Sequence, residues 1–438
     1  MSPVLVAVTN GREIGRVVRD GRGRLTFVYA EAWRRARGAY PLSLSMPLAA
    51  AEHGHRPIES FLWNLLPDNE AVLGRWARRF QVSARNPFAL LSHVGEDCAG
   101  AVQFVRPDRL DAVIGEGPAT VEWLDEAGIA ERLRILRADH AAWRSPNDIG
   151  QFSLAGAQPK TALLYENGRW GVPSGRTPTT HILKPPTGEF DGHAENEHLC
   201  MRLASALGLV TVGSQVRWFA DQIAIVIERY DRERTEAGAL VRVHQEDFCQ
   251  ALAIPPTRKY ENEGGPGARA CAELLRTFSG RPQEDVRRFV DALAFNWLIG
   301  GTDAHAKNYA LLIGAEGRAR LAPLYDIASI LPYDFDAQRV RLAMKIGGAY
   351  RLRDVGPRQW SKLAAELRLK TDELLERIRE LAVTLPDKLA DVRRAAENEG
   401  LDHPLITRLA DALSDRARRC RDAIDMGTAT EASDTDAA

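Results

Sequence analysis

Lysine is scarce in this sequence, and it has neither an excess of charge of one sign nor a long apolar run. Lysine and arginine number 58 against 59 aspartates and glutamates, for a net charge of −1. This balance provides no overall basic field for coating nucleic acid. No apolar run approaches the roughly 20 residues that a membrane span needs, and the N-terminus lacks the basic and apolar regions of a signal peptide. We therefore expect a soluble, cytoplasmic protein without a membrane partner.

Cysteine is also scarce, and its pattern excludes a disulfide framework and a cysteine-based metal site. The five cysteines are odd in number and widely separated, and no two have CxxC spacing. We expect reduced, packed thiols. Arginine is the default cation, because only eight of the 58 basic residues are lysine. A lysine is therefore expected where a compact ammonium is needed and a planar guanidinium would not serve.

The length predicts about three folding units, or two domains of which one is large, and the composition and periodicity of the sequence change along the chain. The Asn10-Gly11 dipeptide between two β-like runs predicts a hairpin. Helical periodicity covers residues 245–252 and 361–385, and 121–127 is typical of a short helical piece. The chain divides into an N-terminal α/β subdomain (1–105), a connecting segment (106–150), a small mixed α/β lobe (151–235), a larger helical lobe (236–426) and a polar, acidic tail expected to be disordered (427–438).

The most specific motif is Gly300-Gly-Thr-Asp-Ala-His-Ala-Lys-Asn308, directly after an apolar helical run. Asp303 and Asn308 have the D-x-x-x-x-N spacing with which a protein kinase presents a base and a metal ligand on one loop. The carboxylate would take the proton of the substrate hydroxyl, and the amide oxygen would hold Mg²⁺ beside the phosphates of ATP. Asp326 follows a predicted β-hairpin, where a second metal-binding carboxylate belongs. An ordinary turn or helix cap is the alternative role for Asp326.

Three upstream features complete a kinase-like order. Lys184 ends a predicted strand, where a rigidly held point charge grips phosphates. Glu195 and Glu197 in the following helix are both placed to pair with it, and the sequence does not choose between them. The small-residue segment 152–161 would let backbone amides approach phosphate oxygens. An apolar predicted strand leads into the polar residues 228–231. In kinases, the hinge that hydrogen-bonds adenine lies at such a junction.

The residues around these features resemble the HipA family of bacterial serine/threonine kinases. Essentially the whole chain takes part in the resemblance. The motifs that carry it are 153–164, 178–184, 245–250, Lys259-Tyr260 with Gly264-Gly-Pro-Gly267, 297–308 and, in the N-terminal part, 41–47, 64–68 and 95–102.

The resemblance implies an α+β fold: a bilobal protein-kinase-like structure with a small mixed α/β N-lobe, a mostly helical C-lobe and an extra N-terminal α/β subdomain. It implies ATP and Mg²⁺ as cofactors. It further implies the toxin of a type II toxin–antitoxin pair, bound by a small helix-turn-helix antitoxin (HipB-like) and through it to operator DNA. The protein substrate would be an aminoacyl-tRNA synthetase of the glutamyl-tRNA synthetase type, whose phosphorylation inhibits translation and promotes growth arrest and persistence.

By position, the resemblance makes Asp303 the catalytic base, Asn308 and Asp326 the metal ligands and Ser153 an autophosphorylated serine. The residues that it places in the ATP site are Ala155, Gly156, Ala157, Gln158, Pro159, Lys160, Lys184, Glu228, Arg229, Tyr230, His305, Lys307, Asn308, Tyr325 and Asp326. Pro159 departs from the family pattern, in which an acidic residue is common, so we expect altered loop mobility and phosphate affinity.

Two other functions stay open at this level. One is a catalytically weak kinase-fold co-repressor that clasps a DNA-binding antitoxin, and the other is a small-molecule phosphotransferase. The joint presence of Lys184, Asp303, Asn308 and Asp326 argues against the co-repressor. Only the family resemblance argues against the small-molecule enzyme.

Overall fold

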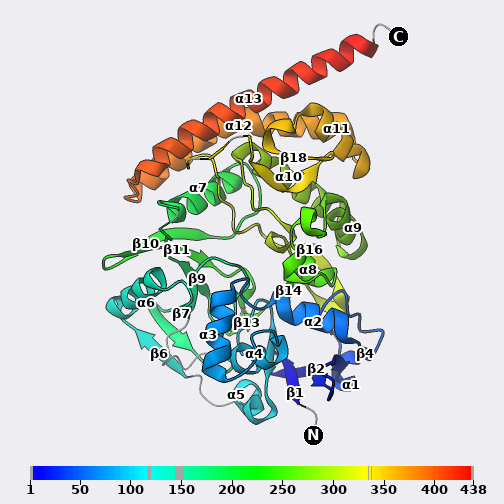
Figure 1. Ribbon diagram of the computed structural model, residues 1–438, viewed down its shortest axis with the longest axis vertical. Helices are drawn as coiled ribbons and strands as arrows, with labels where there is room; N and C mark the ends of the chain where they lie inside the picture. Colours follow the sequence, from blue (N-terminus) through cyan, green and yellow to red (C-terminus); the bar gives the residue numbers. More distant parts are fainter. Residues whose placement is uncertain are drawn as a thin grey trace. The chain divides into compact units, whose positions relative to one another are not determined.

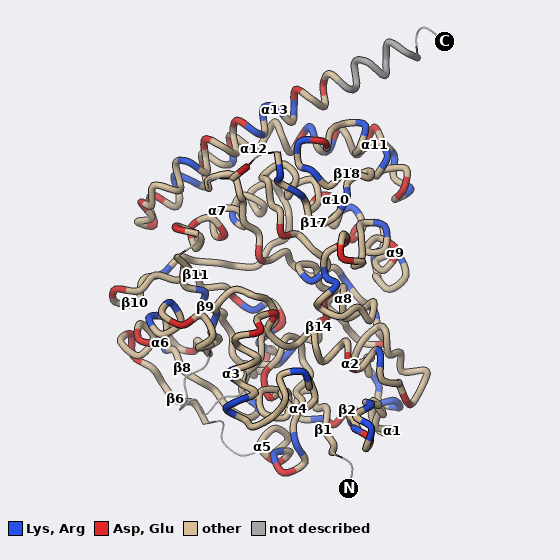
Figure 2. Tube along the Cα trace, viewed as in Figure 1, with Lys and Arg blue, Asp and Glu red and all other residues tan. Residues whose placement is uncertain are grey.

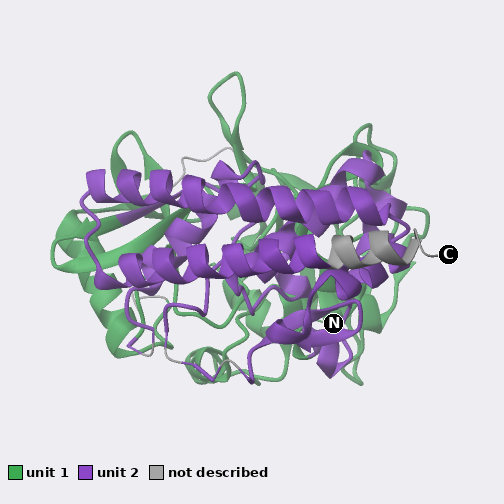
Figure 3. Ribbon diagram, turned by 90° about the horizontal axis from the view of Figure 1, so that it is seen from above, with its two compact units in different colours: residues 1–187, 217–257, 310–322 green, residues 188–216, 258–309, 323–438 purple. Residues whose placement is uncertain are grey.

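The computed structural model describes residues 3–115, 120–143, 152–188, 190–333, 335–336 and 338–435, with side chains described up to residue 426. It contains two compact units, drawn in different colours in Figure 3. Unit 1 comprises residues 1–187, 217–257 and 310–322, and unit 2 comprises 188–216, 258–309 and 323–438. The chain therefore passes between the units several times, whereas the sequence predicts one change of lobe near residue 235.

Unit 1 begins with a five-stranded antiparallel sheet in the order β4-β3-β2-β1-β5 (Figure 1). The predicted hairpin is confirmed, because Thr9 pairs with Arg12 across a two-residue turn. Asn10 and Gly11 both have positive φ, as a type I′ turn requires. The strands are β1 (Val4–Thr9), β2 (Arg12–Arg19), β3 (Leu25–Tyr29), β4 (Glu52–His53) and β5 (Val102–Val105).

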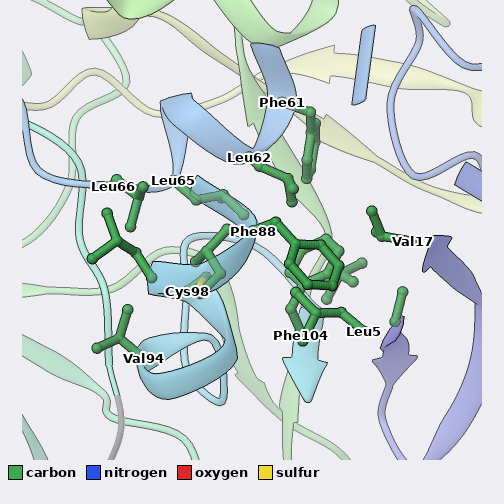
Figure 4. Close-up of a cluster of buried hydrophobic side chains, with 14 of the residues drawn as sticks. Leu5, Val17, Phe61, Leu62, Leu65, Leu66, Phe88, Val94, Cys98 and Phe104 are labelled. Carbon is green, nitrogen blue, oxygen red and sulfur yellow. The ribbon is translucent and has the colours of Figure 1, made fainter. Parts of the chain in front are cut away.

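Four helices accompany this sheet and enclose its core. They are α1 (Glu31–Arg34), α2 (His55–Asn64), α3 (Glu70–Phe80) and α4 (Pro87–Val94). The Asn69 side chain caps α3 by accepting from two backbone amides, which is why a new helix starts directly after Pro67-Asp68. Figure 4 shows apolar side chains of β1, β2, β5, α2 and α4 meeting in the core. Phe152 and Leu154 belong to the same core, so the start of the small-residue segment packs against the N-terminal subdomain.

A six-stranded sheet in the order β10-β11-β9-β7-β8-β6 follows. Its strands are β6 (Val121–Leu124), β7 (Thr161–Glu166), β8 (Arg169–Pro173), β9 (His181–Lys184), β10 (Ser214–Phe219) and β11 (Gln222–Glu228). Helix α6 (Glu126–Ala138) packs Ile129 and Leu133 against the sheet. The helical interpretation of 121–127 is wrong, since Val121 and Trp123 pair with β8, where a side chain at Gly171 would clash with them. Asp125 then caps α6.

The segment 106–150 is therefore more than a connection. Besides β6 and α6 it contains the short helix α5 (Leu110–Ile114), while residues 116–119 and 144–150 lie outside the described residues. Unit 1 also contains β12 (Arg232–Arg234), β13 (Leu240–Arg242), β14 (Gln245–Asp247), α8 (Phe248–Ala251), β15 (Ala310–Ile313) and β16 (Ala319–Leu321). The helix predicted for 245–252 begins as strand β14 because Gln245–Asp247 pair with β15, and the Asp247 side chain then caps α8. The predicted hairpin around 310–324 is confirmed by β15 and β16.

Unit 2 is mainly helical, and its long helices α12 and α13 run side by side (Figures 1 and 3). Its elements are α7 (His193–Ala206), α9 (Ala268–Phe278), α10 (Pro282–Ile299), β17 (Arg341–Ile346), β18 (Ala349–Arg351), α11 (Pro357–Glu366), α12 (Thr371–Asn398) and α13 (Pro404–Thr435). Charged residues of both signs are distributed along α13 (Figure 2).

Two predictions for unit 2 need correction, one of a continuous helix and one of a disordered tail. The single helix expected over 361–385 is broken into α11 and α12, because Arg368 adopts the left-handed conformation between them. The tail expected to be disordered from residue 427 is helical up to Thr435, since extending an existing helix is much easier than nucleating one. Residues 436–438 lie outside the described residues.

Candidate active site

The small-residue loop 153–160 is docked on the N-terminal subdomain within unit 1. Ser153 is completely buried, and its hydroxyl donates to the Leu65 carbonyl oxygen at 2.8 Å. The Ser153 amide donates to the Asp97 carbonyl oxygen at 2.9 Å. The Asp68 amide donates to the Gly156 carbonyl oxygen at 3.0 Å, and Pro67 forms a β-bridge with Gly156. The turn that ends α2 thus holds the candidate phosphate loop in place.

Lys160 ends this loop and turns back on it. Its ammonium donates to the Ala155 carbonyl oxygen at 2.7 Å and lies 5.3 Å from the centroid of the Trp143 ring. Gly156 has a φ of +101°, and a Cβ there would lie 2.6 Å from the Lys160 ammonium. Glycine is therefore required for this closed turn. Of the remaining loop residues, Ala155, Ala157, Gln158 and Pro159 lie in the same segment, and only Pro159 is buried.

Lys184 ends β9 and is 5 % exposed. Thr161 pairs with Leu183 across β7 and β9, so Lys160 and Lys184 lie at the same end of the two strands. On the other side, Lys184 pairs with Ile225 of β11. The six-stranded sheet therefore places two of the eight lysines of the chain at the same end of neighbouring strands, and both side chains are buried.

The predicted hinge residues differ in what they can offer a nucleotide. Glu228 is exposed at the end of β11. Tyr230 is half-buried, and its hydroxyl donates to the Gln245 side-chain oxygen. The Arg229 guanidinium is buried and fully engaged elsewhere, with the Asp231 carboxylate and the Cys98 carbonyl oxygen. A contact of Arg229 with ATP would have to use its backbone carbonyl, because its amide already donates to Thr180.

Arg229 belongs to a buried ionic cluster that sequence reasoning missed. Its members are three guanidinium groups and two carboxylates, from Arg229, Arg232, Arg242, Asp97 and Asp231. Burial alone would raise the pKa of Asp97, but the three guanidinium groups together hold that pKa well below its usual range. The cluster ties the loop after α4 to the segment after β11. No local pattern could have revealed it, because its members lie up to 145 residues apart.

In unit 2, the end of α10 fixes the start of the candidate catalytic loop. Gly300 caps the helix in the left-handed conformation, with a φ of 66°. A Cβ at Gly301 would lie 2.3 Å from the Asn296 side-chain oxygen, so the chain can turn only without a side chain there. Asp303 follows with its side chain 65 % exposed. An exposed carboxylate on a firmly held loop is accessible to a substrate hydroxyl.

Asn308 and Asp326 are the two predicted metal ligands. The Asn308 side-chain amide nitrogen donates to the Asp303 carbonyl oxygen at 2.7 Å, so the amide oxygen is the atom that could bind a metal ion. The Tyr325 hydroxyl donates to the Lys307 carbonyl oxygen at 2.8 Å, which links the residue before Asp326 to the residue before Asn308. Asp326 has a φ of 59°, a left-handed conformation that aspartate tolerates.

These two oxygen donors suit Mg²⁺ rather than a transition metal. The described residues contain no cluster of three or more His, Cys, Asp or Glu side chains that could hold a metal ion. Mg²⁺ commonly takes one or two protein oxygens and fills its coordination shell with water and phosphate oxygens. The donor set of Asn308 and Asp326 therefore fits the group that the sequence predicts.

His305 is buried between the members of the loop. Its Nε2 lies 3.9 Å from Asp303 Oδ1, and its backbone amide donates to the Asp303 carbonyl oxygen at 2.8 Å. Burial lowers the pKa of His305 to about 4, so the ring is neutral near pH 7. Lys307 is likewise buried, within the turn that leads to Asn308.

Tyr260 also lies at this site, although the sequence did not predict a role for it. Its hydroxyl donates to Asp303 Oδ1 at 2.5 Å. The signal was present, since Lys259-Tyr260 is one of the family-like motifs, but nothing in the spacing of 43 residues indicates the contact.

Unit 1 thus brings together the loop 153–160, Lys184 and the strand before the hinge, and unit 2 brings together Asp303, His305, Asn308 and Asp326. Glu195 and Glu197 are both buried on α7 of unit 2. The pairing of one of them with Lys184 stays a prediction. A phosphate-gripping part on a sheet and a base with two metal ligands on a helical part define the class of a protein-kinase-like phosphotransferase.

Comparison with known proteins identifies the family. Residues 152–389 match the model of the HipA-like C-terminal domain, and residues 5–105 match that of the HipA N-terminal domain. The chain belongs to the HipA family of serine/threonine kinases.

Relatives and a solved structure agree with this. The putative kinase Y4mE of Sinorhizobium fredii is 38% identical over 414 residues, covering 94% of this chain and 97% of the relative. The serine/threonine-protein kinase toxin HipA of Shewanella oneidensis is 30% identical, covering 83% of each chain. The structure of the Shewanella oneidensis HipA, HipB and operator DNA complex superposes with a TM-score of 0.82 at 25% identity, over 96% of this chain and 98% of that one. The predicted α+β kinase-like fold is confirmed. Among the described residues, no helix is both long and apolar enough to cross a membrane.

Proposed function

We propose that this chain is an ATP- and Mg²⁺-dependent protein serine/threonine kinase that acts as the toxin of a type II toxin–antitoxin pair. The observation that carries the proposal is the geometry of the Asp303–Asn308 loop. There the Asp303 carboxylate is exposed, the Asn308 side chain is bonded to the Asp303 backbone, and the Tyr325 hydroxyl ties the segment of Asp326 to the Lys307 backbone. Two similar proteins, one described as a putative kinase and one as a serine/threonine-protein kinase toxin, support the same activity.

In this proposal each residue has one task. Lys160 and Lys184 neutralise phosphate charge, and the amides of loop 153–160 approach the phosphate oxygens. Asp303 accepts the proton of the substrate hydroxyl, while neutral His305 packs beside it without contributing a competing charge. Asn308 and Asp326 would hold Mg²⁺, which neutralises the charge that develops on the phosphates. Little covalent chemistry is required, so positioning supplies most of the rate enhancement.

The partners are proposed from the family. The antitoxin would be a small helix-turn-helix protein similar to HipB, which would connect this chain to operator DNA. The substrate would be an aminoacyl-tRNA synthetase, and its phosphorylation would arrest translation. The cytoplasm is the compartment in which both partners would be found.

The test is transfer of ³²P from γ-labelled ATP with Mg²⁺ to a panel of purified aminoacyl-tRNA synthetases from the host. Asp303→Asn serves as the matched control. We expect one synthetase to be labelled by the wild-type protein and none by the variant. Labelling of unrelated proteins alone would retain the kinase and reject the synthetase. Labelling of small molecules alone would favour the small-molecule phosphotransferase, and tight antitoxin binding without any transfer would favour the co-repressor.

A further inference from the structure

Tyr260 contacts the candidate catalytic base directly. Its hydroxyl donates to Asp303 Oδ1 at 2.5 Å, and no other side-chain donor within hydrogen-bond distance of that carboxylate is found in the described part of the chain. Asp303 is otherwise exposed on the loop, with its side chain 65 % accessible. A carboxylate in that situation rotates freely about its terminal torsion unless something restrains it. The Tyr260 hydroxyl supplies the restraint.

The segment around Tyr260 is built to hold the ring in this place. The amides of Glu263 and Gly265 both donate to the Tyr260 carbonyl oxygen, at 3.1 and 2.9 Å. A Cβ at Gly265 would lie only 2.1 Å from the Arg258 carbonyl oxygen and 2.7 Å from that of Tyr260. Gly267 leaves room for the Glu261 carboxylate, which a Cβ there would approach to 2.6 Å. The Gly264-Gly-Pro-Gly267 motif therefore closes a tight loop that presents Tyr260.

Contacts of the Tyr260 ring and of the neighbouring residue Glu261 hold the Tyr260 hydroxyl in this orientation. The Tyr260 ring meets the His305 ring edge to face at 4.9 Å between centroids. The Lys259 ammonium lies 5.5 Å from the Tyr260 ring centroid. Glu261 accepts from the Lys345 amide at 2.6 Å, which anchors the segment to β17. Tyr260 donates the hydrogen bond to Oδ1, whereas His305 Nε2, at 3.9 Å from the same oxygen, lies beyond hydrogen-bond distance.

We propose that Tyr260 is a positioning residue for the phosphoryl transfer, acting through Asp303; this rests on the proposed function. Its hydroxyl occupies Oδ1 and turns Oδ2 toward the substrate. In the transfer step the substrate hydroxyl oxygen forms the new bond to the γ-phosphorus, and the bond from that phosphorus to the leaving oxygen of ADP breaks. The substrate proton passes to Asp303 Oδ2. Tyr260 keeps its own proton throughout.

The same contact is also compatible with an inhibitory role of Tyr260, and the experiment distinguishes the two roles. A hydroxyl that donates to the base can also occupy the place of the substrate hydroxyl and inhibit the enzyme. Removal of a positioning group slows the chemical step, whereas removal of an inhibitory group speeds it. The substitution Tyr260→Phe deletes only the hydroxyl and keeps the ring against His305. Tyr350→Phe is the matched control, because Tyr350 lies on β18 with its ring 5.1 Å from the Lys345 ammonium, and among the described residues it has no hydrogen bond or ring contact with the catalytic loop.

The experiment measures kcat and the KM for ATP of wild type, Tyr260→Phe and Tyr350→Phe. A hydrogen bond to a carboxylate predicts a fall of about 10- to 100-fold in kcat for Tyr260→Phe, with the KM for ATP within about twofold of wild type. Tyr350→Phe should match wild type in both. Gly265→Ala keeps the hydroxyl but displaces the loop, and should lower kcat as Tyr260→Phe does.

Four results would overturn this role. An unchanged kcat would show that the contact has no effect on the reaction, and a raised kcat would show that Tyr260 is inhibitory. A fall in kcat with an equal rise in the KM for ATP would indicate general disruption of the site. Absence of phosphate transfer by the wild-type protein would refute the proposed function, and the role of Tyr260 together with it.

Discussion

Phosphorylation of Ser153 should release loop 153–160 from the N-terminal subdomain and abolish tight ATP binding. The hydroxyl is completely buried and donates to a carbonyl oxygen, so a phosphate there would place oxygens against an acceptor. The modification adds about 1.5 to 2 negative charges near neutral pH. Burying such a group without a partner costs several kcal/mol. We therefore expect the modified loop to leave its docked position.

The docked loop has a comparable stabilisation to lose. Phe152 and Leu154 are each about 4 % exposed, and burial of such a side chain contributes about 1.5–3 kcal/mol. Two hydrogen bonds, from Ser153 to Leu65 and from Asp68 to Gly156, add about 1 kcal/mol each. The cost of ordering the loop offsets most of these gains, so the docked form is favoured by a small margin. A net change of about 3 kcal/mol in favour of the undocked form would weaken ATP affinity roughly 100-fold.

Calorimetric titration with ATP and Mg²⁺ tests this with Ser153→Asp, Ser153→Ala and the control Ser83→Asp. Ser83 is exposed in the same subdomain, so a carboxylate there stays in water. We expect Ser153→Asp to lose about 100-fold in affinity and the other two to bind nearly as wild type does. Hydrogen exchange of the amides of 152–160 should become fast only in Ser153→Asp. Normal ATP affinity in a protein whose Ser153 is fully phosphorylated, as judged by mass spectrometry, would refute the argument.

Local patterns were sufficient for the parts of the fold whose contacts lie close in the sequence. The Asn10-Gly11 turn defines a hairpin because positive φ is required at both positions. The D-x-x-x-x-N spacing is read within one loop, where the Asn308 amide contacts the Asp303 backbone five residues away. The strand with Lys184 follows from the short β-like run 180–183 that precedes the lysine.

Contacts between distant segments determined the rest. The pattern around Trp123 also fits a helix. Trp123 lies in strand β6 because it pairs with β8, where Gly171 leaves room for its side chain. Arg229 was expected to contact ATP, yet its guanidinium is held by Asp231 and by a carbonyl oxygen 131 residues away. The hydrogen bond from Tyr260 to Asp303 likewise joins segments that no periodicity relates.

Three further substitutions test the site and the interior. Asp303→Asn should lower phosphoryl transfer at least 100-fold while ATP affinity changes less than about twofold, as measured by ³²P transfer and titration, and transfer at the wild-type rate would exclude Asp303 as the base. Lys184→Arg should lose activity by orders of magnitude with little change in Tm, because a planar fork displaces the phosphates; full activity would contradict the argument from scarce lysine. Glu246→Gln should stabilise the protein more at pH 8 than at pH 5, as measured by urea unfolding. Glu246 is completely buried with Oε1 accepting from the Leu44 amide at 2.8 Å, and burial raises its pKa to about 8. Between pH 4.5 and 8 the folded state therefore retains a proton that the unfolded state has released, so the free energy of unfolding of the wild type falls by up to about 1.4 kcal/mol per pH unit relative to the variant. Glutamine keeps an oxygen that accepts from the Leu44 amide, and it does not titrate. If the difference in the free energy of unfolding between the two proteins stayed constant from pH 5 to 8, Glu246 would be ionised in the folded state.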